Sequence, residues 1–189
     1  MKIEELFNIL TINKPSVLIK EKEDEVFDLI PELKPCKGFK QHSIWHQYDV
    51  YEHILHVVDN VDDCIELRLA ALFHDLGKPE TFELDNQGRG HFPGHCEVSQ
   101  EIFIKFADKH NLPQELTNLV SKLILYHDIR FPKISDKEKE NIFNELGKEG
   151  IELLFELEKA DLKAQNPDFH HPLLEQLEEQ KEEIIGKHK

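Results

Sequence analysis

The sequence predicts an all-α protein, a compact bundle of helices. Apolar residues recur at helical spacing along most of the 189 residues, and only 8 glycines and 9 prolines interrupt them. We find no internal repeat or low-complexity tract. The chain suits a single domain, 1–189, with a core over about 25–167 and two appendages, an N-terminal helix at 1–22 and a charged C-terminal helix at 170–189. In order, the expected helices cover residues 2–11, 23–31, 49–63, 65–76, 96–109, 113–127, 136–146, 149–164 and 172–186.

Local signals mark the ends of several of these helices. Asp49 and Glu52 have the D-x-x-E spacing of a capping box, which opens the third helix. Gly77 and Pro79 follow the run LRLAALFHDL, so we expect the fourth helix to stop there, with Gly77 as its C′ residue. The stretch 81–94 is the one long irregular connection, and its D-N-Q-G predicts a turn between two short extended pieces.

Composition excludes several classes of function. The net charge is −15, and an acidic surface repels a phosphate backbone, so we expect no non-specific nucleic-acid binding. No apolar run reaches the roughly 18–20 residues that cross a bilayer, so we expect no membrane partner. The acidic start, MKIEELFNIL, lacks a signal-peptide pattern and favours a cytoplasmic protein.

The three cysteines do not form a recognisable site. Cys36, Cys64 and Cys96 are odd in number, widely spaced and without a C-x-x-C pair. This pattern argues against a disulfide framework and against a thiolate zinc site. We expect the three side chains to be small buried hydrophobes.

Polar residues interrupt the apolar faces of five expected helices. Stepping four residues from Leu123 leads to His127, and stepping four from Leu157 leads to Asp161, where another hydrophobe would ordinarily follow. A lone inward histidine is more often a core residue hydrogen-bonded to a carbonyl, but an inward carboxylate needs charged or multiple partners. The residues that point inward, or nearly so, are His53, His74, Asp75, His95, His127 and Asp161.

A shared metal centre accounts for all six residues at once. Nine of the 12 histidines lie between His42 and His127, which is itself a compositional hint of metal binding. Imidazole and carboxylate ligands suit Mn²⁺, Fe, Co²⁺, Ni²⁺ or Zn²⁺, and affinity order alone does not choose among them. Six ligands exceed the needs of one ion, so we expect one or two divalent ions. Asp75, next to His74, is the natural bridging carboxylate between two.

The order H…HD…H…H…D resembles the HD-domain metal-dependent phosphohydrolases. Several stretches are more closely similar to the HD domain attached to bacterial tRNA nucleotidyltransferases, the CCA-adding enzymes, over roughly residues 25–167. These stretches are DVYEHIL, AALFHDLGKPETF, HFPGHCEVSQEI, LILYHD and ADLKAQNP. Only 48 residues precede DVYEHIL, and no G-S…D-x-D signature occurs, so we expect the hydrolase part alone.

The resemblance implies a helical bundle of the HD-domain type and a site for metal-dependent hydrolysis. By position, His53, His74, Asp75 and Asp161 match the family's core metal ligands. The two further histidines, His95 and His127, match those of members that hold two metals.

The expected function is cleavage of a phosphomonoester or phosphodiester of a nucleotide-like small molecule by a metal-activated water. Besides Asp75, the candidate catalytic residues are Lys78, which could contact a phosphate oxygen as a point charge, and His91, which could donate a proton to the leaving group. Without such roles, Lys78 would be a solvent-facing lysine and His91 an exposed loop histidine. Two alternatives stay open: a nucleotide-sensing module without turnover, and a di-iron oxygenase on the same scaffold.

Overall fold

A computed structural model describes residues 1–166 and 173–187. In these residues the regular secondary structure is almost entirely helical, which confirms the expected all-α class. No helix among them is both long and apolar enough to cross a membrane. The helices are α1 (Ile3–Leu10), α2 (Pro15–Glu21), α3 (Glu23–Leu29), α4 (Val50–Asn60), α5 (Ile65–Phe73), α6 (Lys78–Thr81), α7 (His95–Lys109), α8 (Gln114–Tyr126), α9 (Asp136–Lys163) and α10 (Leu177–Gly186), with 3₁₀ turns η1 (Pro31–Cys36) and η2 (Phe131–Lys133).

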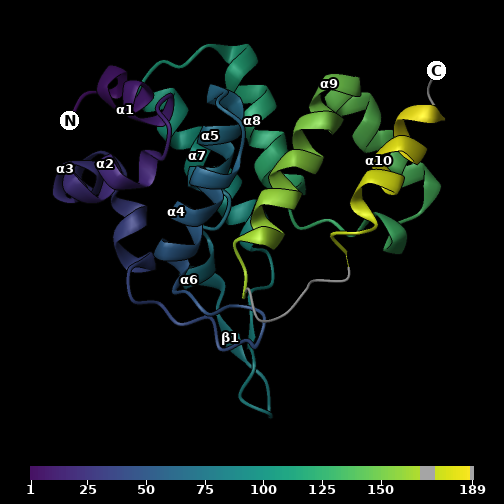
Figure 1. Cartoon of the computed structure of the whole chain (residues 1–189), viewed down its shortest axis with the longest axis horizontal. Helices are drawn as coiled ribbons and strands as arrows, with labels where there is room; N and C mark the ends of the chain where they lie inside the picture. Colours follow the sequence, from purple (N-terminus) through teal and green to yellow (C-terminus); the bar gives the residue numbers. More distant parts are fainter. Residues whose placement is uncertain (167–172, 188–189) are drawn as a thin grey trace.

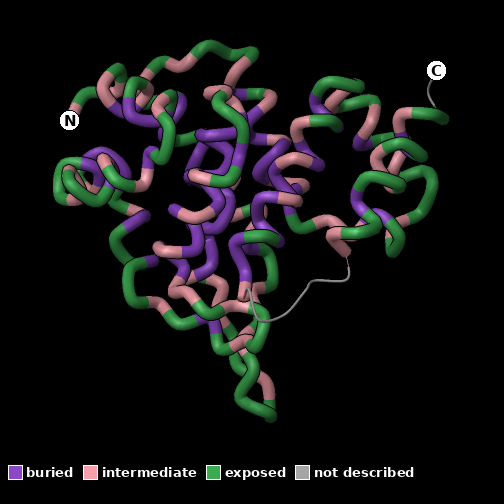
Figure 2. The backbone as a smooth tube through the Cα atoms, viewed as in Figure 1, coloured by how far each residue is buried: buried purple, intermediate pink, exposed green. Residues whose placement is uncertain are grey.

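Five helices form the centre of the molecule. Helix α5 packs against α4, α7, α8 and α9, and α7 lies alongside α8 (Figure 1). Helices α1–α3 lie on one side of this group, and α10 packs against α9 on the opposite side (Figure 1). The buried part of the backbone runs through the central helices, as Figure 2 shows. The centre is therefore enclosed by helices on both sides.

The N-terminal stretch differs from the single helix expected over 1–22. It forms α1 and α2, and Pro15 supplies the first residue of α2, where its missing N–H is tolerated. Leu6, Leu10 and Ile19 are fully buried in the same core as the central helices. The two short helices thus contribute to the main hydrophobic core.

The start of α4 carries half of the expected capping box. The Asp49 carboxylate accepts hydrogen bonds from the backbone N–H of Glu52 at 2.7 Å and of Gly38 at 2.8 Å. The Glu52 side chain does not return the bond, which corrects the expected box. It pairs instead with Lys20 Nζ of α2, at 2.7 Å. Asp49 therefore fixes both the helix and the loop before it.

Gly77 is not the left-handed C′ residue that the sequence predicted. Its φ is −76°, which any residue adopts. Its role is close packing, because a Cβ at this position would lie 2.5 Å from the carbonyl oxygen of His95 and 2.8 Å from Cβ of Val98. The Gly77 N–H also donates to Ser99 Oγ at 2.9 Å. The absence of a side chain lets α7 lie directly against the turn that carries His74 and Asp75.

The irregular stretch 81–94 has the expected turn between extended pieces. Strands β1 (Glu83–Leu84) and β2 (Gly90–His91) pair antiparallel, with Glu83 opposite His91. This hairpin protrudes from the helical body (Figure 1).

The two expected helices 136–146 and 149–164 form one helical stretch, α9, with a break at Gly147, where φ is +67°. The expected C-terminal helix 172–186 corresponds to α10, and residue 172 lies outside the described residues.

Candidate metal centre

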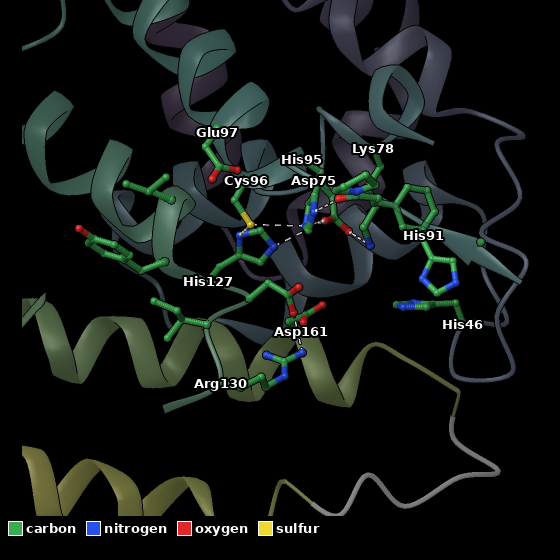
Figure 3. A pocket seen from close by; sticks show the side chains of 18 of the residues that line it. His46, Asp75, Lys78, His91, His95, Cys96, Glu97, His127, Arg130 and Asp161 are labelled. Atoms are coloured by element: carbon green, nitrogen blue, oxygen red, sulfur yellow. Dashed lines mark hydrogen bonds and ion pairs between the residues drawn. The ribbon is translucent and has the colours of Figure 1, made fainter. Parts of the chain in front are cut away.

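The six side chains expected to bind metal meet at one point in the structure. They project from α4, from the turn after α5, from the first turn of α7, from the end of α8 and from α9. Each is at most 7% exposed. They are His53, His74, Asp75, His95, His127 and Asp161, and Figure 3 shows four of them facing one another.

All four histidines have the same orientation. In each ring Nδ1 lies within hydrogen-bond distance of a backbone carbonyl oxygen, which can accept a proton from it. For His53, His74, His95 and His127 the acceptors are the carbonyls of Ala164, Ala71, Phe92 and Ile124, at 3.3, 2.8, 2.9 and 2.7 Å. Nε2 of each ring therefore faces the other side chains of the cluster. Metal-binding histidines are commonly held in this way.

Asp75 lies between the four rings. Its Oδ2 is 3.4 Å from Nε2 of His53 and 3.2 Å from Nε2 of His74. Its Oδ1 is 3.6 Å from Nε2 of both His95 and His127. The carboxylate thus presents one oxygen to each pair of histidines.

The donor set fits divalent ions. Among the described residues, neither oxygen of Asp75 has a hydrogen-bond partner of good geometry, and Nε2 of His74 has none either. Such groups are unfavourable when buried unless a charge compensates them. Asp161 Oδ1 lies 2.8 Å from His53 Nε2 and 3.8 Å from His74 Nε2, so it completes a second group of ligand atoms beside Asp75. Nitrogen and carboxylate donors of this kind are those that transition-metal ions and zinc prefer.

Both carboxylates are negatively charged at neutral pH. Burial favours the protonated form of Asp75, but its interactions with His74, Lys78 and His127 outweigh burial and hold the pKa of Asp75 well below its usual range. Burial also favours the protonated form of Asp161, but the hydrogen bond with His53 outweighs burial and lowers the pKa of this carboxyl. Burial lowers the pKa of His74, which favours the neutral ring. Two carboxylates beside a neutral ring are suited to a cation.

Lys78 faces this cluster, not solvent. Its Nζ lies 2.7 Å from Asp75 Oδ2 and donates to Gln41 Oε1 at 2.8 Å. Burial alone would lower the pKa of Lys78, but the Asp75 charge raises it, so the ammonium stays charged. The cation also lies 5.2 Å from the centre of the Phe92 ring. The interpretation of Lys78 as an ordinary solvent lysine is therefore wrong, and its contact with a phosphate oxygen stays a prediction.

His91 lies apart from the buried cluster. It is on β2, its side chain is 56% exposed, and its Nε2 is 3.1 Å from Asp85 Oδ2. It nevertheless lines the same pocket as Asp75 (Figure 3). The structure places it at the rim, and its role as a proton donor stays a prediction.

Cys96 is a site residue that the sequence analysis missed. Its Sγ lies 3.6 Å from His95 Nε2 and 3.7 Å from His127 Nδ1. Burial alone would raise the pKa of this thiol, but His127 and His95 outweigh it and lower the pKa to about 6. Cys36 is a buried hydrophobe as expected, whereas Cys96 is partly exposed and polar in its contacts. The only signal in the sequence was its position directly after a candidate ligand.

A pocket of about 720 Å³ opens onto the cluster. This volume suits a ligand of nucleotide size. His46 lines it with a buried Nδ1 that has no hydrogen-bond partner within residues 1–166 and 173–187, and burial lowers the pKa of His46 to about 3. Arg130 lines it as well, with its guanidinium 2.5 Å from Asp128 Oδ1. The sequence did not single out either residue. The site thus has a buried ligand set, an open approach and two cationic side chains, Lys78 and Arg130.

Comparison with known proteins identifies the family. Residues 44–187 match the model of the HD domain. The chain is 36% identical over 110 residues to a CC-adding tRNA nucleotidyltransferase of Thermus thermophilus, and 32% identical over 109 residues to an A-adding tRNA nucleotidyltransferase of Deinococcus radiodurans. It is 26% identical over 171 residues to a bifunctional uridylyltransferase/uridylyl-removing enzyme of Vibrio vulnificus.

These relatives are much longer proteins. The first two matches cover 55% and 54% of this chain but 25% of each relative, and the third covers 74% of this chain but 18% of the relative. The chain therefore spans a quarter or less of the length of the relatives that it matches.

Proposed function

The chain belongs to the HD domain family, and on this premise we propose that it is a metal-dependent phosphohydrolase. It would cleave a phosphomonoester or phosphodiester bond of a small nucleotide-like molecule. The observation that carries this proposal is the position of Asp75, a buried carboxylate with one oxygen toward each pair of histidine nitrogens. That arrangement offers donors for one or two divalent ions.

The ligands would divide into two groups around Asp75. His53, His74 and Asp161 would hold one ion, and His95 and His127 the other, with Asp75 common to both. A bound divalent ion supplies Lewis acidity, which lowers the pKa of water toward neutrality and neutralises charge on phosphoryl oxygens. The backbone carbonyls that hold each Nδ1 keep the rings in place, so little reorganisation is needed on binding.

Residues around the cluster would orient the substrate. Lys78 already presents a buried ammonium beside Asp75, and it would attract a phosphoryl oxygen into the site. Arg130, on the pocket wall, would contact a more distant part of an anionic substrate. His91 lies at the rim, where a protonated ring could donate to the leaving oxygen as it departs.

Two observations support a nucleotide-like substrate. The pocket volume of about 720 Å³ accommodates a small molecule and is open to solvent. The names of the three relatives refer to nucleotidyl or uridylyl groups, and one name includes a uridylyl-removing activity.

The test is turnover of a panel of phosphate esters. Metal-stripped full chain is re-supplied with Mn²⁺, Co²⁺, Ni²⁺ or Zn²⁺ and assayed on p-nitrophenyl phosphate, bis-p-nitrophenyl phosphate and 2′,3′-cyclic AMP. We expect hydrolysis that depends on added metal and is abolished in Asp75→Ala. Metal-loaded protein without turnover on any ester would favour the sensing module, and oxygen consumption by iron-loaded protein would favour the oxygenase.

A further inference from the structure

We propose that Cys96 is a metal ligand, so that the ion position formed by His95 and His127 includes a thiolate. This inference rests on the proposed function, because it concerns one of the two ion positions of the same centre. The thiolate would distinguish the two ion positions by the chemistry of their ligands. The position with sulfur would select Zn²⁺ or Co²⁺, whereas the position of His53, His74 and Asp161 has only nitrogen and oxygen donors.

The distances fit ligands of one ion. Zinc–nitrogen and zinc–sulfur bonds of roughly 2.0 and 2.3 Å at a tetrahedral angle place two donor atoms roughly 3.3–3.6 Å apart. Sγ of Cys96 lies 3.6 Å from Nε2 of His95, the atom that also faces Asp75. A possible ligand atom from each of His95, Cys96 and His127 lies within 4.8 Å of the other two. In His127 the nitrogen at 3.7 Å from Sγ is Nδ1, and Nε2 is the nitrogen that faces Asp75. The thiol is therefore already at ligand distance from its neighbour.

The carboxylate of Asp75 provides the independent observation that an ion belongs here. Its Oδ1 is buried, has no hydrogen-bond partner in the part of the chain that the structure describes, and lies 3.6 Å from Nε2 of both His95 and His127. Lys78 does not compensate this atom, since its ammonium contacts the other oxygen, Oδ2. Two imidazoles, one carboxylate oxygen and one thiolate make a four-ligand set of the kind that zinc takes.

Two further features favour a charged sulfur at this place. Cys96 is the second residue of α7, a helix of 15 residues, and an anion is stabilised near a helix N-terminus. Cys96 also lines the pocket, so an ion can reach it from solvent (Figure 3). Figure 3 shows Sγ directed toward His95 and His127.

The test is optical titration of the metal-free full chain with Co²⁺. A thiolate ligand gives an intense sulfur-to-cobalt charge-transfer band in the near ultraviolet, whereas nitrogen and oxygen ligands give only weak visible bands. We expect the charge-transfer band in wild type and its loss in Cys96→Ser. Cys64→Ser is the matched control, because Cys64 precedes α5 and is not among the residues of the centre, and it should keep the band.

Zinc competition gives a second readout. We expect Cys96→Ser to lower the Zn²⁺ affinity of the position formed by His95 and His127 by at least about 10–100-fold, the loss that removal of even an outer-shell partner causes. Its Mn²⁺ affinity should change much less. Visible cobalt bands without a charge-transfer band in wild type would overturn the thiolate ligand and leave the proposed function standing. Failure of wild type to bind cobalt at all by equilibrium dialysis would overturn both.

Discussion

At the scale of single residues, the protein keeps charged groups where apolar ones would ordinarily lie. Asp75 is 1% exposed and Lys78 is 6% exposed, and their ion pair at 2.7 Å compensates only one oxygen of the carboxylate. Removing one partner of a buried pair leaves an uncompensated charge, which is strongly unfavourable. We therefore relate the Asp75–Lys78 pair to the binding of metal and phosphate and not to stability alone.

Replacing Lys78 tests its contact with substrate. Lys78→Met removes the ammonium while keeping most of the side-chain volume. We expect kcat/KM of the metal-loaded protein to fall about 100-fold, because a fixed positive charge near the reacting phosphoryl group is lost. Lys133→Met, an exposed lysine in η2, is the control and should keep wild-type values. Equal kcat/KM for Lys78→Met and wild type, measured on the best ester of the panel, would remove Lys78 from the site.

Glu158 gives a pH-dependent stability that can be measured in metal-free protein. Burial raises its pKa well above the usual value, so the folded state holds a proton that the unfolded state releases. Its contribution is present at pH values below the unfolded pKa and is lost as pH rises toward the folded pKa. Glu158→Gln cannot ionise, so we expect the variant to gain stability relative to wild type as pH rises.

Thermal unfolding at about pH 5 and about pH 8 checks this expectation. Glu152→Gln, at an exposed position of the same helix, serves as the control and should show no such trend. The expectation would be contradicted if Glu158→Gln and wild type differed in stability by the same amount at both pH values.

The single-residue pattern of the site could be predicted from sequence because helical periodicity places side chains on faces. Histidines and aspartates on apolar faces pointed to a common centre, and the structure brings all six together. Cys96 could not be found in this way. Its approach to His127 depends on how α7 packs on α8, which no pattern within a single helix records.

At the scale of elements, helix ends position the site. His74 and His127 are the C-terminal caps of α5 and α8, and the negative end of a helix dipole suits a nearby cation. His95 is the first residue of α7, so this ligand comes from the N-terminal end of its helix. Helix α7 reaches the others because Gly77 has no side chain in its path. Small changes at this contact should therefore move a ligand.

Gly77→Ala tests the packing of α7 on the α5–α6 turn. The new Cβ would meet the His95 carbonyl at 2.5 Å, so we expect a loss of about 1–3 kcal/mol in the free energy of unfolding, as overpacking typically causes. Because the clash falls on His95, the metal affinity should fall too. Gly186→Ala is the control, since a Cβ there meets nothing within 4 Å. The free energy of unfolding of wild type and of both variants is measured in urea. A Gly77→Ala protein as stable as wild type would show that α7 shifts at little cost.

Long helices could be predicted from the repeated spacing of their apolar residues, and short helices less well. Helix α2 has only seven residues, too few for a clear apolar stripe, and it was missed. The role of Gly77 could not be predicted, because the sequence around a glycine after a helix is the same whether the glycine forms a left-handed turn or allows close packing. The three-dimensional neighbour, α7, distinguishes the two.

At the scale of the whole molecule, the metal centre lies where the central helices meet. Ligands from α4, α7, α8, α9 and the turn after α5 come together only in the folded chain. An ion that binds the folded state alone stabilises it, by about 2.7 kcal/mol at a hundredfold excess over Kd. The pocket above the centre is also a product of the whole fold, so its lining by His46 and Arg130 was not predictable from local patterns.

Metal addition should therefore raise the unfolding temperature. For a chain of this size, about 2.7 kcal/mol corresponds to a shift of roughly 5–10 °C. We expect this shift when Zn²⁺ or Mn²⁺ is added to metal-stripped wild type, measured by circular dichroism, and a much smaller one in Asp75→Asn. Unfolding temperatures that do not respond to any of the divalent ions would mean that the helices meet without a metal between them.

The central claim is that the buried cluster around Asp75 holds metal, and metal content tests it most directly. Wild type and Asp75→Asn are incubated with Zn²⁺ or Mn²⁺, freed of unbound ion by gel filtration, and analysed by mass spectrometry for metal per chain. The account predicts one or two ions in wild type and a clear loss in Asp75→Asn, which keeps the size of the side chain but loses its charge. Wild type without bound metal, or a variant that retains as much metal as wild type, would contradict it.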